Sequence, residues 1–438
     1  QMGYTYVTEA AAPPLEARHV HEELSDIPVV DKGALILMGN SHFVPSLIRD
    51  KDFERLKDYV VFLIKACGGY GIKAVNPGGG VNWRSRENAR GLDDEIREYG
   101  ITPREVIDVL IDVNEELGLP HALHLHCNNL GLPTGGETTL ETMLMAKGRR
   151  LHITHMQFGA YRPVKGRPFG SFAGRLAECV NGNPNITMDV GQVVFGPAVT
   201  MTADAPLQYS LHTLTNDRWV NKETEMETQS GIVSLTYRKK TYAGSIQWIA
   251  GLELFLMIEN PWQVSLTTDH PNGGPFTAYP WIIKLLMDRG FREAVAETVN
   301  KRALGSSELP RLSREYTLEE IAIITRAGPA KTLGLVNKGH LGIGADADIA
   351  IYKPNNDFEA MFQKAVYVLK GGDTVVKDGE VVSETFGKTY VPSLPERKDV
   401  TPWLHPVFSK FYSMALENYP VEKEKYMPYE VVSCQPYV

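Results

Sequence analysis

Ala122-Leu123-His124-Leu125-His126-Cys127-Asn128-Asn129-Leu130-Gly131 is a short apolar run that passes directly into a polar loop. Before it, Thr102-Pro103-Arg104-Glu105 has the composition of a helix start, with Thr as the cap, Pro in the first turn and Glu after them. After it, residues 137–147 have helical spacing of apolar side chains. The stretch therefore predicts a buried strand between two helices.

The same unit recurs along the chain. Apolar runs at 71–75, 151–154, 186–190 and 262–266 each end in polar or glycine-rich residues, and further helices are predicted at 52–66, 172–180 and 278–288. Strands that alternate with helices indicate a parallel sheet. Strand ends rich in His, Asp, Lys and Asn favour an α/β fold of the (β/α)8 barrel type, with its active site at the carboxyl-terminal rim. An open doubly wound sheet is the competing architecture, although neither a GxGxxG fingerprint nor a Walker sequence supports it.

The character of the sequence changes near residue 341. Short β runs separated by glycine turns follow, among them an Asp378-Gly379 hairpin turn, and they predict a small β-sandwich half at 336–390. We therefore expect the barrel to occupy residues 1–335. Residues 391–438 form a proline-rich extension.

Composition excludes several classes of protein. The 438 residues carry 45 Lys and Arg against 53 Asp and Glu, a net charge of −8, with no basic cluster that would suit nucleic acid. No apolar run reaches the roughly 18 residues of a membrane span. The four cysteines are widely spaced, which is typical of free thiols in a reducing cytoplasm.

Four predicted strand ends carry groups that suit a metal centre: Lys73, His126, His155 and Asp269. Nitrogen and oxygen ligands on separate strands are typical of catalytic zinc sites. A Lys ammonium has no lone pair, but a neutral amine can take up CO2 to give a carbamate whose oxygens bridge two metals. Taken alone, each of these residues more often has a structural role than a role as a metal ligand. Their joint occurrence at successive strand ends favours a two-metal site that polarises a carbonyl and activates water.

The order Lys, His, His, Asp resembles the amidohydrolase superfamily, whose members carry a carboxylated lysine after the fourth barrel strand, histidines after the fifth and sixth, and an aspartate after the eighth. Residues 338–350 and 325–331 are similar to that family's return to its small β-sandwich and to the segment before it. Longer stretches resemble the A subunits of formylmethanofuran dehydrogenases, at 2–24, 70–79, 124–131, 151–158, 266–276 and 319–331.

The resemblance implies two zinc ions bridged by N-carboxylated Lys73, with His126 and His155 on one ion and Asp269 on the other. It implies that formate, made from CO2 at the tungsten or molybdenum pterin site of a partner subunit with iron-sulfur subunits, is condensed here with the amine of methanofuran. Asp269 would shuttle the proton. Asn128 would bind the formyl oxygen and His270 would orient Asp269, although a structural role for these two is equally open.

One element of the family pattern is missing, the His-x-His pair at the end of the first barrel strand. His19-Val20-His21 has the spacing but is polar on both sides, and His124-Leu125-His126 belongs to a later strand. We therefore expect the pair, the first strand and half of the β-sandwich to lie upstream of residue 1, so that this chain is a fragment.

Three other functions stay open at this point. A dihydropyrimidinase-like cyclic amidohydrolase would share the metal ligands. The corresponding subunit of a bacterial formyltransferase/hydrolase complex would release formate instead of condensing it. A metal-free scaffold subunit is the third possibility.

Overall fold

The computed structural model describes residues 1–84, 91–200, 219–221 and 231–435. Its main sheet has nine strands in the order β12-β8-β5-β4-β3-β2-β17-β18, with β1 paired to β2, and every pair is parallel. The strands are β1 (Tyr6–Ala12), β2 (Asp31–Leu37), β3 (Gly71–Val75), β4 (Leu123–His126), β5 (Leu151–Ile153), β8 (Ile186–Asp189), β12 (Val264–Ser265), β17 (Thr389–Pro392) and β18 (Tyr429–Val432).

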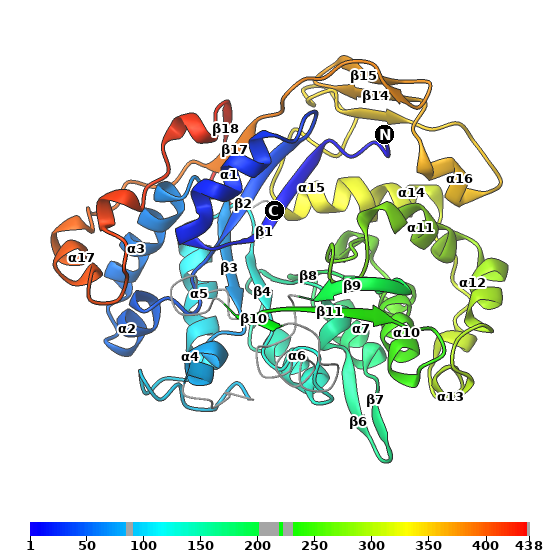
Figure 1. Ribbon diagram of the computed structural model, residues 1–438, viewed down its shortest axis with the longest axis horizontal. Coiled ribbons are helices and arrows are strands. Elements are labelled where there is room, and N and C mark those ends of the chain that lie inside the picture. Colours follow the sequence, from blue (N-terminus) through cyan, green and yellow to red (C-terminus); the bar gives the residue numbers. More distant parts are fainter. Residues whose placement is uncertain (85–90, 201–218, 222–230, 436–438) are drawn as a thin grey trace.

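Helices connect the successive strands and lie outside them (Figure 1). They are α1 (Ala17–Ser25), α2 (Phe43–Arg49), α3 (Phe53–Ala66), α4 (Gly79–Arg84), α5 (Pro103–Glu116), α6 (Gly135–Leu144), α7 (Ala173–Gly182), α10 (Tyr242–Met257) and α11 (Tyr279–Met287). The predicted α/β organisation with a mainly parallel sheet is confirmed. The strand order fits a TIM-like barrel. Among the described residues β1 and β12 do not pair with each other, so barrel closure stays a prediction.

The two faces of the sheet differ in chemistry. Lys73, His124 and His152 occupy corresponding register positions on β3, β4 and β5, so their side chains share one face. Their neighbours Ala74 and Leu125 point the opposite way, toward the helices, and are fully buried. A polar stripe therefore runs along the inner face of strands whose outer face is apolar.

Local signals determine the helix positions well. Thr102 caps α5, its side chain accepts from the Glu105 N–H, and the Glu105 carboxylate accepts from the Thr102 N–H in return. This is the capping box that the sequence predicted. Asp378 and Gly379 both have positive φ, 52° and 78°, at the predicted hairpin turn.

Smaller elements surround the main sheet. A three-stranded sheet of β9 (Gly196–Thr200), β10 (Trp219–Asn221) and β11 (Gly231–Tyr237) lies between β8 and α10 in the chain, and β6 (Tyr161–Val164) pairs with β7 (Arg167–Ser171). The four-stranded antiparallel sheet comprises β13 (Ile349–Ile351), β14 (Tyr367–Lys370), β15 (Asp373–Lys377) and β16 (Glu380–Val381).

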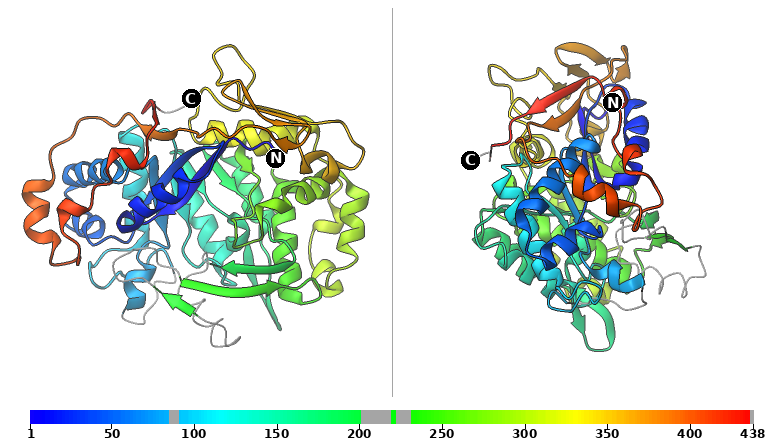
Figure 2. Two further views of the ribbon diagram at one scale, coloured as in Figure 1. Left: turned by 45° about the horizontal axis from the view of Figure 1, so that its top comes forward. Right: turned by 90° about the vertical axis from the view of Figure 1, so that its left-hand side faces the viewer.

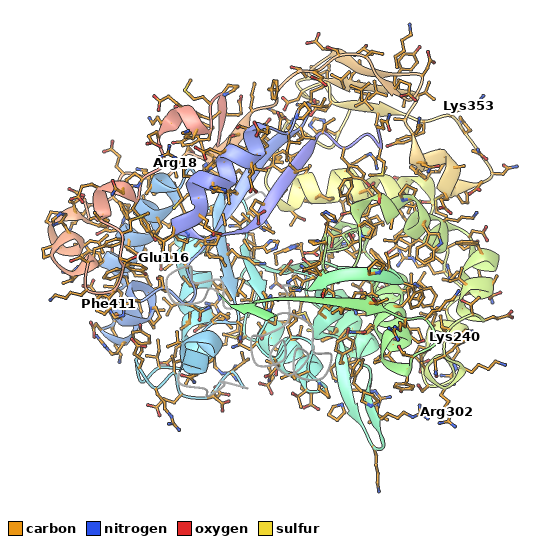
Figure 3. All side chains as sticks on the ribbon, viewed as in Figure 1. Arg18, Glu116, Lys240, Arg302, Lys353 and Phe411 are labelled. Atoms are coloured by element: carbon orange, nitrogen blue, oxygen red, sulfur yellow. The ribbon has the colours of Figure 1, made fainter. Side chains whose placement is uncertain are left out.

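Further helices follow in the second half of the chain, among them α12 (Arg289–Ala296), α14 (Leu318–Ala322), α16 (Phe358–Gln363) and α17 (Thr401–Phe408). The C-terminal segment with α17 lies beside α2 and α3, where Phe43 and Phe408 stack 6.2 Å apart (Figure 2). Arg302 and Lys353 are exposed at the margin of the molecule (Figure 3). Within the described ranges, no helix combines the length and the apolar character needed to cross a membrane.

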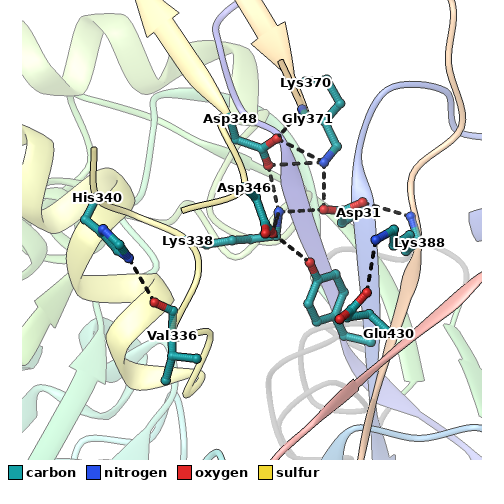
Figure 4. A network of polar contacts seen from close by, with 11 residues as sticks. Asp31, Val336, Lys338, His340, Asp346, Asp348, Lys370, Gly371, Lys388 and Glu430 are labelled. Atoms are coloured by element: carbon teal, nitrogen blue, oxygen red, sulfur yellow. Dashed lines mark hydrogen bonds and ion pairs between the residues drawn. The ribbon is translucent and has the colours of Figure 1, made fainter. Parts of the chain in front are cut away.

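A buried ionic network joins the small antiparallel sheet to the start of β2 (Figure 4). The Lys338 ammonium lies 2.6 Å from a carboxylate oxygen of Asp31 and 2.7 Å from one of Asp348. Lys370 contacts the same two carboxylates at 2.7 and 3.1 Å. Burial opposes the charge of Lys338, but these carboxylates hold its pKa above the ordinary value. The network therefore anchors the small sheet to the amino end of the parallel strands.

We expect Lys338→Met to lower the free energy of unfolding by about 3–5 kcal/mol, because it leaves two buried carboxylates without one of their two cations. Lys364→Met is the matched control, since Lys364 makes an exposed 2.8 Å ion pair with Glu380 on the same small sheet. Its expected effect is about 0–1 kcal/mol. Urea unfolding of both variants measures the difference, and equal losses would contradict a structural role for the buried network.

Candidate metal centre

The inner face of β3 places Lys73 in the middle of the sheet, where its side chain is 3% exposed. Burial lowers the pKa of Lys73 to about 8, although the charges of Asp189, Asp269 and Glu9 oppose this shift. The lowered pKa increases the fraction of molecules in which Lys73 carries a neutral amine at neutral pH. The neutral amine is the form that reacts with CO2.

His126 and His155 lie together at the carboxyl ends of β4 and β5. Their ring centroids are 4.8 Å apart and the rings are nearly perpendicular. Burial, reinforced by the charge of Lys73, lowers the pKa of His155 to about 3, and burial also lowers that of His126. Both rings are therefore neutral, and Nδ1 of His155 is buried with no hydrogen-bond partner among the described residues. Neutral imidazoles with an available lone pair fit a metal centre.

The backbone turns sharply at Asp269, the fourth candidate ligand. His155 and Asp269 both have left-handed backbone conformations, with φ of 36° and 49°. Asp269 accepts a 3.0 Å hydrogen bond at Oδ2 from the Asn272 side chain. The Tyr237 hydroxyl in turn donates to the Asn272 carbonyl at 3.0 Å. The position of the Asp269 carboxylate is thus fixed by Asn272 of its own loop, which in turn contacts Tyr237 of the three-stranded sheet.

Gly191 is the spacer between the two strand ends. It has φ +68°, and a Cβ placed on it would lie 2.6 Å from His155 Cβ and 3.4 Å from Asp269 Cβ. Any larger residue would push the histidine away from the aspartate. The close approach of these two candidate ligands therefore depends on glycine at this position.

We expect Gly191→Ala to reduce metal binding by at least about tenfold, because displacing groups that hold metal ligands typically costs about 10–100-fold in affinity. Gly166→Ala is the matched control: Gly166 has a similar φ of +72°, but no atom lies within 4 Å of the place that its Cβ would take. Both variants carry the backbone strain, and only the first carries the clash. Metal titration of the two proteins separates the effects, and equal affinities would contradict the spacer role.

Three residues of the inner face were not among the predicted ligands: His124, His152 and Asp189. Their potential ligand atoms lie within 4.8 Å of one another. Asp189 accepts hydrogen bonds from the His155 backbone N–H at 3.0 Å, from Thr267 Oγ1 at 2.7 Å and from His152 Nε2 at 3.3 Å. Burial alone would raise its pKa, but the His152 hydrogen bond and its charge hold the pKa below the ordinary value. Asp189 is therefore an ionised carboxylate beside Lys73, and its position at the end of the predicted strand 186–190 was the signal available in the sequence.

The predicted role of Asn128 needs correction. Its side-chain nitrogen donates to Asn76 Oδ1 and to the Pro77 carbonyl, both at 3.0 Å. Because a carbonyl only accepts, the Pro77 contact fixes the orientation of the amide. Both N–H groups are used, so Asn128 cannot donate to a formyl oxygen. Its remaining atom, Oδ1, is a buried acceptor.

His270 directly follows Asp269 in the chain and is exposed. It contributes to a cavity of about 850 Å³ lined mainly by apolar residues of β9, β11 and the 271–275 loop. Its ring packs against Phe276, with 5.1 Å between centroids. The Asn272 side chain donates a hydrogen bond to Asp269 Oδ2, and the orienting role of His270 stays a prediction.

The His19-Val20-His21 spacing lies in α1 rather than at a strand end. Nε2 of His21 is 2.9 Å from the Cys67 carbonyl oxygen, and His19 is exposed. The two rings do not form a metal-binding pair. This agrees with the interpretation made from their polar surroundings.

This chain belongs to the amidohydrolase family, which matches residues 1–383. Within it, the chain is 45% identical to Protein FwdA of Methanocaldococcus jannaschii, over 97% of this chain and 79% of that protein. It is 43% identical to the A subunit of the formyltransferase/hydrolase complex Fhc of Methylorubrum extorquens, over 89% of this chain and 72% of that protein. The predicted resemblance to the A subunits of formylmethanofuran dehydrogenases is confirmed.

A solved structure supports the same relationship. The formyltransferase/hydrolase complex FhcABCD of Methylorubrum extorquens, crystallised with methylofuran, contains a chain that is 40% identical. It superposes with a TM-score of 0.95 over 99% of this chain and 81% of that one.

Proposed function

We propose that this chain condenses formate with the primary amine of methanofuran to give formylmethanofuran, reversibly, as the A subunit of a formylmethanofuran dehydrogenase. Formate would come from CO2 reduction at a tungsten or molybdenum pterin site in a partner subunit, with iron-sulfur subunits supplying electrons. The observation that carries the proposal is the convergence of buried Lys73 with neutral His126 and His155 and with Asp269.

Carboxylated Lys73, His126, His155 and Asp269 would hold two zinc ions, whose chemistry is to polarise a carbonyl and activate water. The donor set fits, because it combines neutral imidazoles with a carboxylate and with a lysine whose lowered pKa permits carboxylation. Carboxylation of Lys73 also removes a positive charge that would otherwise lie near the other three candidate ligands.

Asp269 would move the proton. In the condensation, the N–C bond forms as the amine nitrogen attacks the carbon of formate, and a C–O bond breaks. The alkylammonium ion first loses one proton to give the free amine, and the attacking nitrogen loses a second. The Asp269 carboxylate would relay both protons in turn to the departing oxygen, so that formate and the alkylammonium ion give the formamide and water. The Asn272 hydrogen bond holds Oδ2 of Asp269 while the transfer takes place.

The cavity beside His270 would receive the furan end of the substrate. Its proline-rich, mainly apolar lining suits a flat aromatic ring, and His270 borders it within the same loop as Asp269. The 40% identical relative was crystallised with methylofuran, which supports a furan cofactor as the substrate class.

A test of the proposed function supplies the purified complex with ¹³C-formate and methanofuran and follows the ¹³C-formamide by NMR. Formation of the formamide, and its hydrolysis in the reverse assay, is the expected result. A protein that processes cyclic ureides but not the formamide would contradict the proposal.

The near-equal identity to the Fhc relative makes formyl hydrolysis the second candidate, because the same residues would serve the reverse direction. Copurification separates the two. Tungsten or molybdenum with iron-sulfur subunits is expected for the dehydrogenase. An intact complex that lacks them, yet releases formate, would favour the formyltransferase/hydrolase assignment.

A further inference from the structure

A pair of buried histidines, His121 and His124, lies beside the proposed centre. Nδ1 of His121 is 2.8 Å from the carbonyl oxygen of Thr332, and its Nε2 is 2.9 Å from Nδ1 of His124. A carbonyl oxygen can only accept, so Nδ1 of His121 carries the hydrogen. Burial lowers the pKa of His121 to about 3, so the ring is neutral and its Nε2 carries a lone pair that can accept a hydrogen bond.

The tautomer of His124 follows from this chain of contacts. Because His121 Nε2 accepts, His124 must donate from Nδ1, and in the neutral ring Nε2 then carries a lone pair. That nitrogen is buried and has no hydrogen-bond partner among the described residues. An unmatched buried acceptor typically costs about 1–3 kcal/mol. We therefore expect a hydrogen-bond donor next to Nε2 of His124.

A third metal ion is one possible occupant, since His124, His152 and Asp189 lie close together. The remaining donors are already engaged, however. His152 uses Nδ1 on Thr187 Oγ1 at 2.9 Å and Nε2 on Asp189. Asp189 accepts three hydrogen bonds. His124 Nε2 alone does not make a metal site, so a hydrogen-bond donor is the better match.

Lys73, on the adjacent strand, can supply such a donor once it is carboxylated. It is the register partner of His124 on the adjacent strand, both side chains are buried on the inner face, and the Lys73 charge acts on the His124 ring. Carboxylation joins the neutral Nζ to the carbon of CO2, one C=O electron pair moves to oxygen, and one proton passes from Nζ to solvent water. The product is a planar carbamate with a single N–H.

We propose that His124 is a positioning residue whose Nε2 accepts this single N–H of carboxylated Lys73, with its tautomer set by His121 and Thr332. The inference rests on the proposed function. Since the carbamate is planar, fixing its N–H fixes the direction of its two oxygens toward the candidate ligands. Lys73 thus presents the bridge in one orientation before a metal binds.

The test compares His124→Gln, which keeps an acceptor at a similar reach, with His124→Leu, which removes it. Each full-length protein is equilibrated with ¹³C-bicarbonate, and the carbamate signal of Lys73 is measured by NMR together with zinc content. We expect the bicarbonate needed for half occupancy to rise about tenfold in His124→Leu, the equivalent of one lost hydrogen bond, and to stay within about twofold in His124→Gln. Equal occupancy in the two variants would overturn the proposal.

A second measurement does not depend on either variant folding. ¹⁵N NMR of histidine-labelled wild-type protein reports which ring nitrogen of His124 is protonated. The expected state is a protonated Nδ1 and a bare Nε2, and a protonated Nε2 would overturn the positioning role. A wild-type protein with no carbamate overturns the proposed function as well, whereas a normal carbamate in His124→Leu overturns only the role of His124.

Discussion

Lys73→Ala is expected to remove the bound metal ions and to lower amide-forming activity by at least about 10³-fold. The variant deletes the group that would bridge the ions, and each of the two metal-assisted effects is typically worth several kcal/mol. The fold should persist, because Lys73 is a polar group facing the interior of a sheet whose outer face holds the apolar core. Metal analysis and the ¹³C-formate assay measure the two losses on the same sample.

Lys32→Ala is the matched control for this experiment. Lys32 is also a buried strand lysine with a pKa lowered by burial, but it lies at the start of β2, away from the strand ends that carry the histidines. It should retain full zinc content and activity. If Lys73→Ala also retained both, the assignment of Lys73 as the metal bridge would be wrong.

Much of the architecture could be predicted because its signals are local. The run 71–75 is a strand with the predicted bounds, and Thr102 forms the predicted capping box with Glu105. Short apolar runs and helix caps depend on residues that are neighbours in the sequence, so the sequence alone predicts them. The four candidate ligands Lys73, His126, His155 and Asp269 were found in the same way, as polar groups that end apolar runs.

The remaining parts of the site depend on register and on orientation. Whether His124 and His152 face the inside follows from their pairing with Lys73 across three strands, which the sequence does not encode locally. The orientation of the Asn128 side-chain amide follows from its contact with the Pro77 carbonyl. The spacer role of Gly191 appears only when two distant loops are brought together. Such features are tertiary, and sequence spacing alone leaves them open.

The exchange of Asp269 for asparagine is expected to lower kcat by about 10²–10⁴-fold, because the amide cannot take the proton that leaves the amine. The hydrogen bond from Asn272 can be kept if the new amide presents its oxygen to Nδ2 of that residue. An amide nitrogen is a poor metal ligand, so we expect one of the two ions to bind more weakly, while the ion that His126 and His155 would hold remains.

Asp373→Asn, an exposed aspartate of β15, controls for the loss of one negative charge. It should leave kcat unchanged, and the circular dichroism spectra of both variants should match the wild type. Separate measurement of kcat, KM and metal stoichiometry distinguishes the two losses expected at Asp269. An Asp269→Asn protein that turned over at the wild-type rate with both ions bound would show that another group moves the proton, and Asp189, which lies beside Lys73 and is held as a carboxylate by three hydrogen bonds, would be the next candidate.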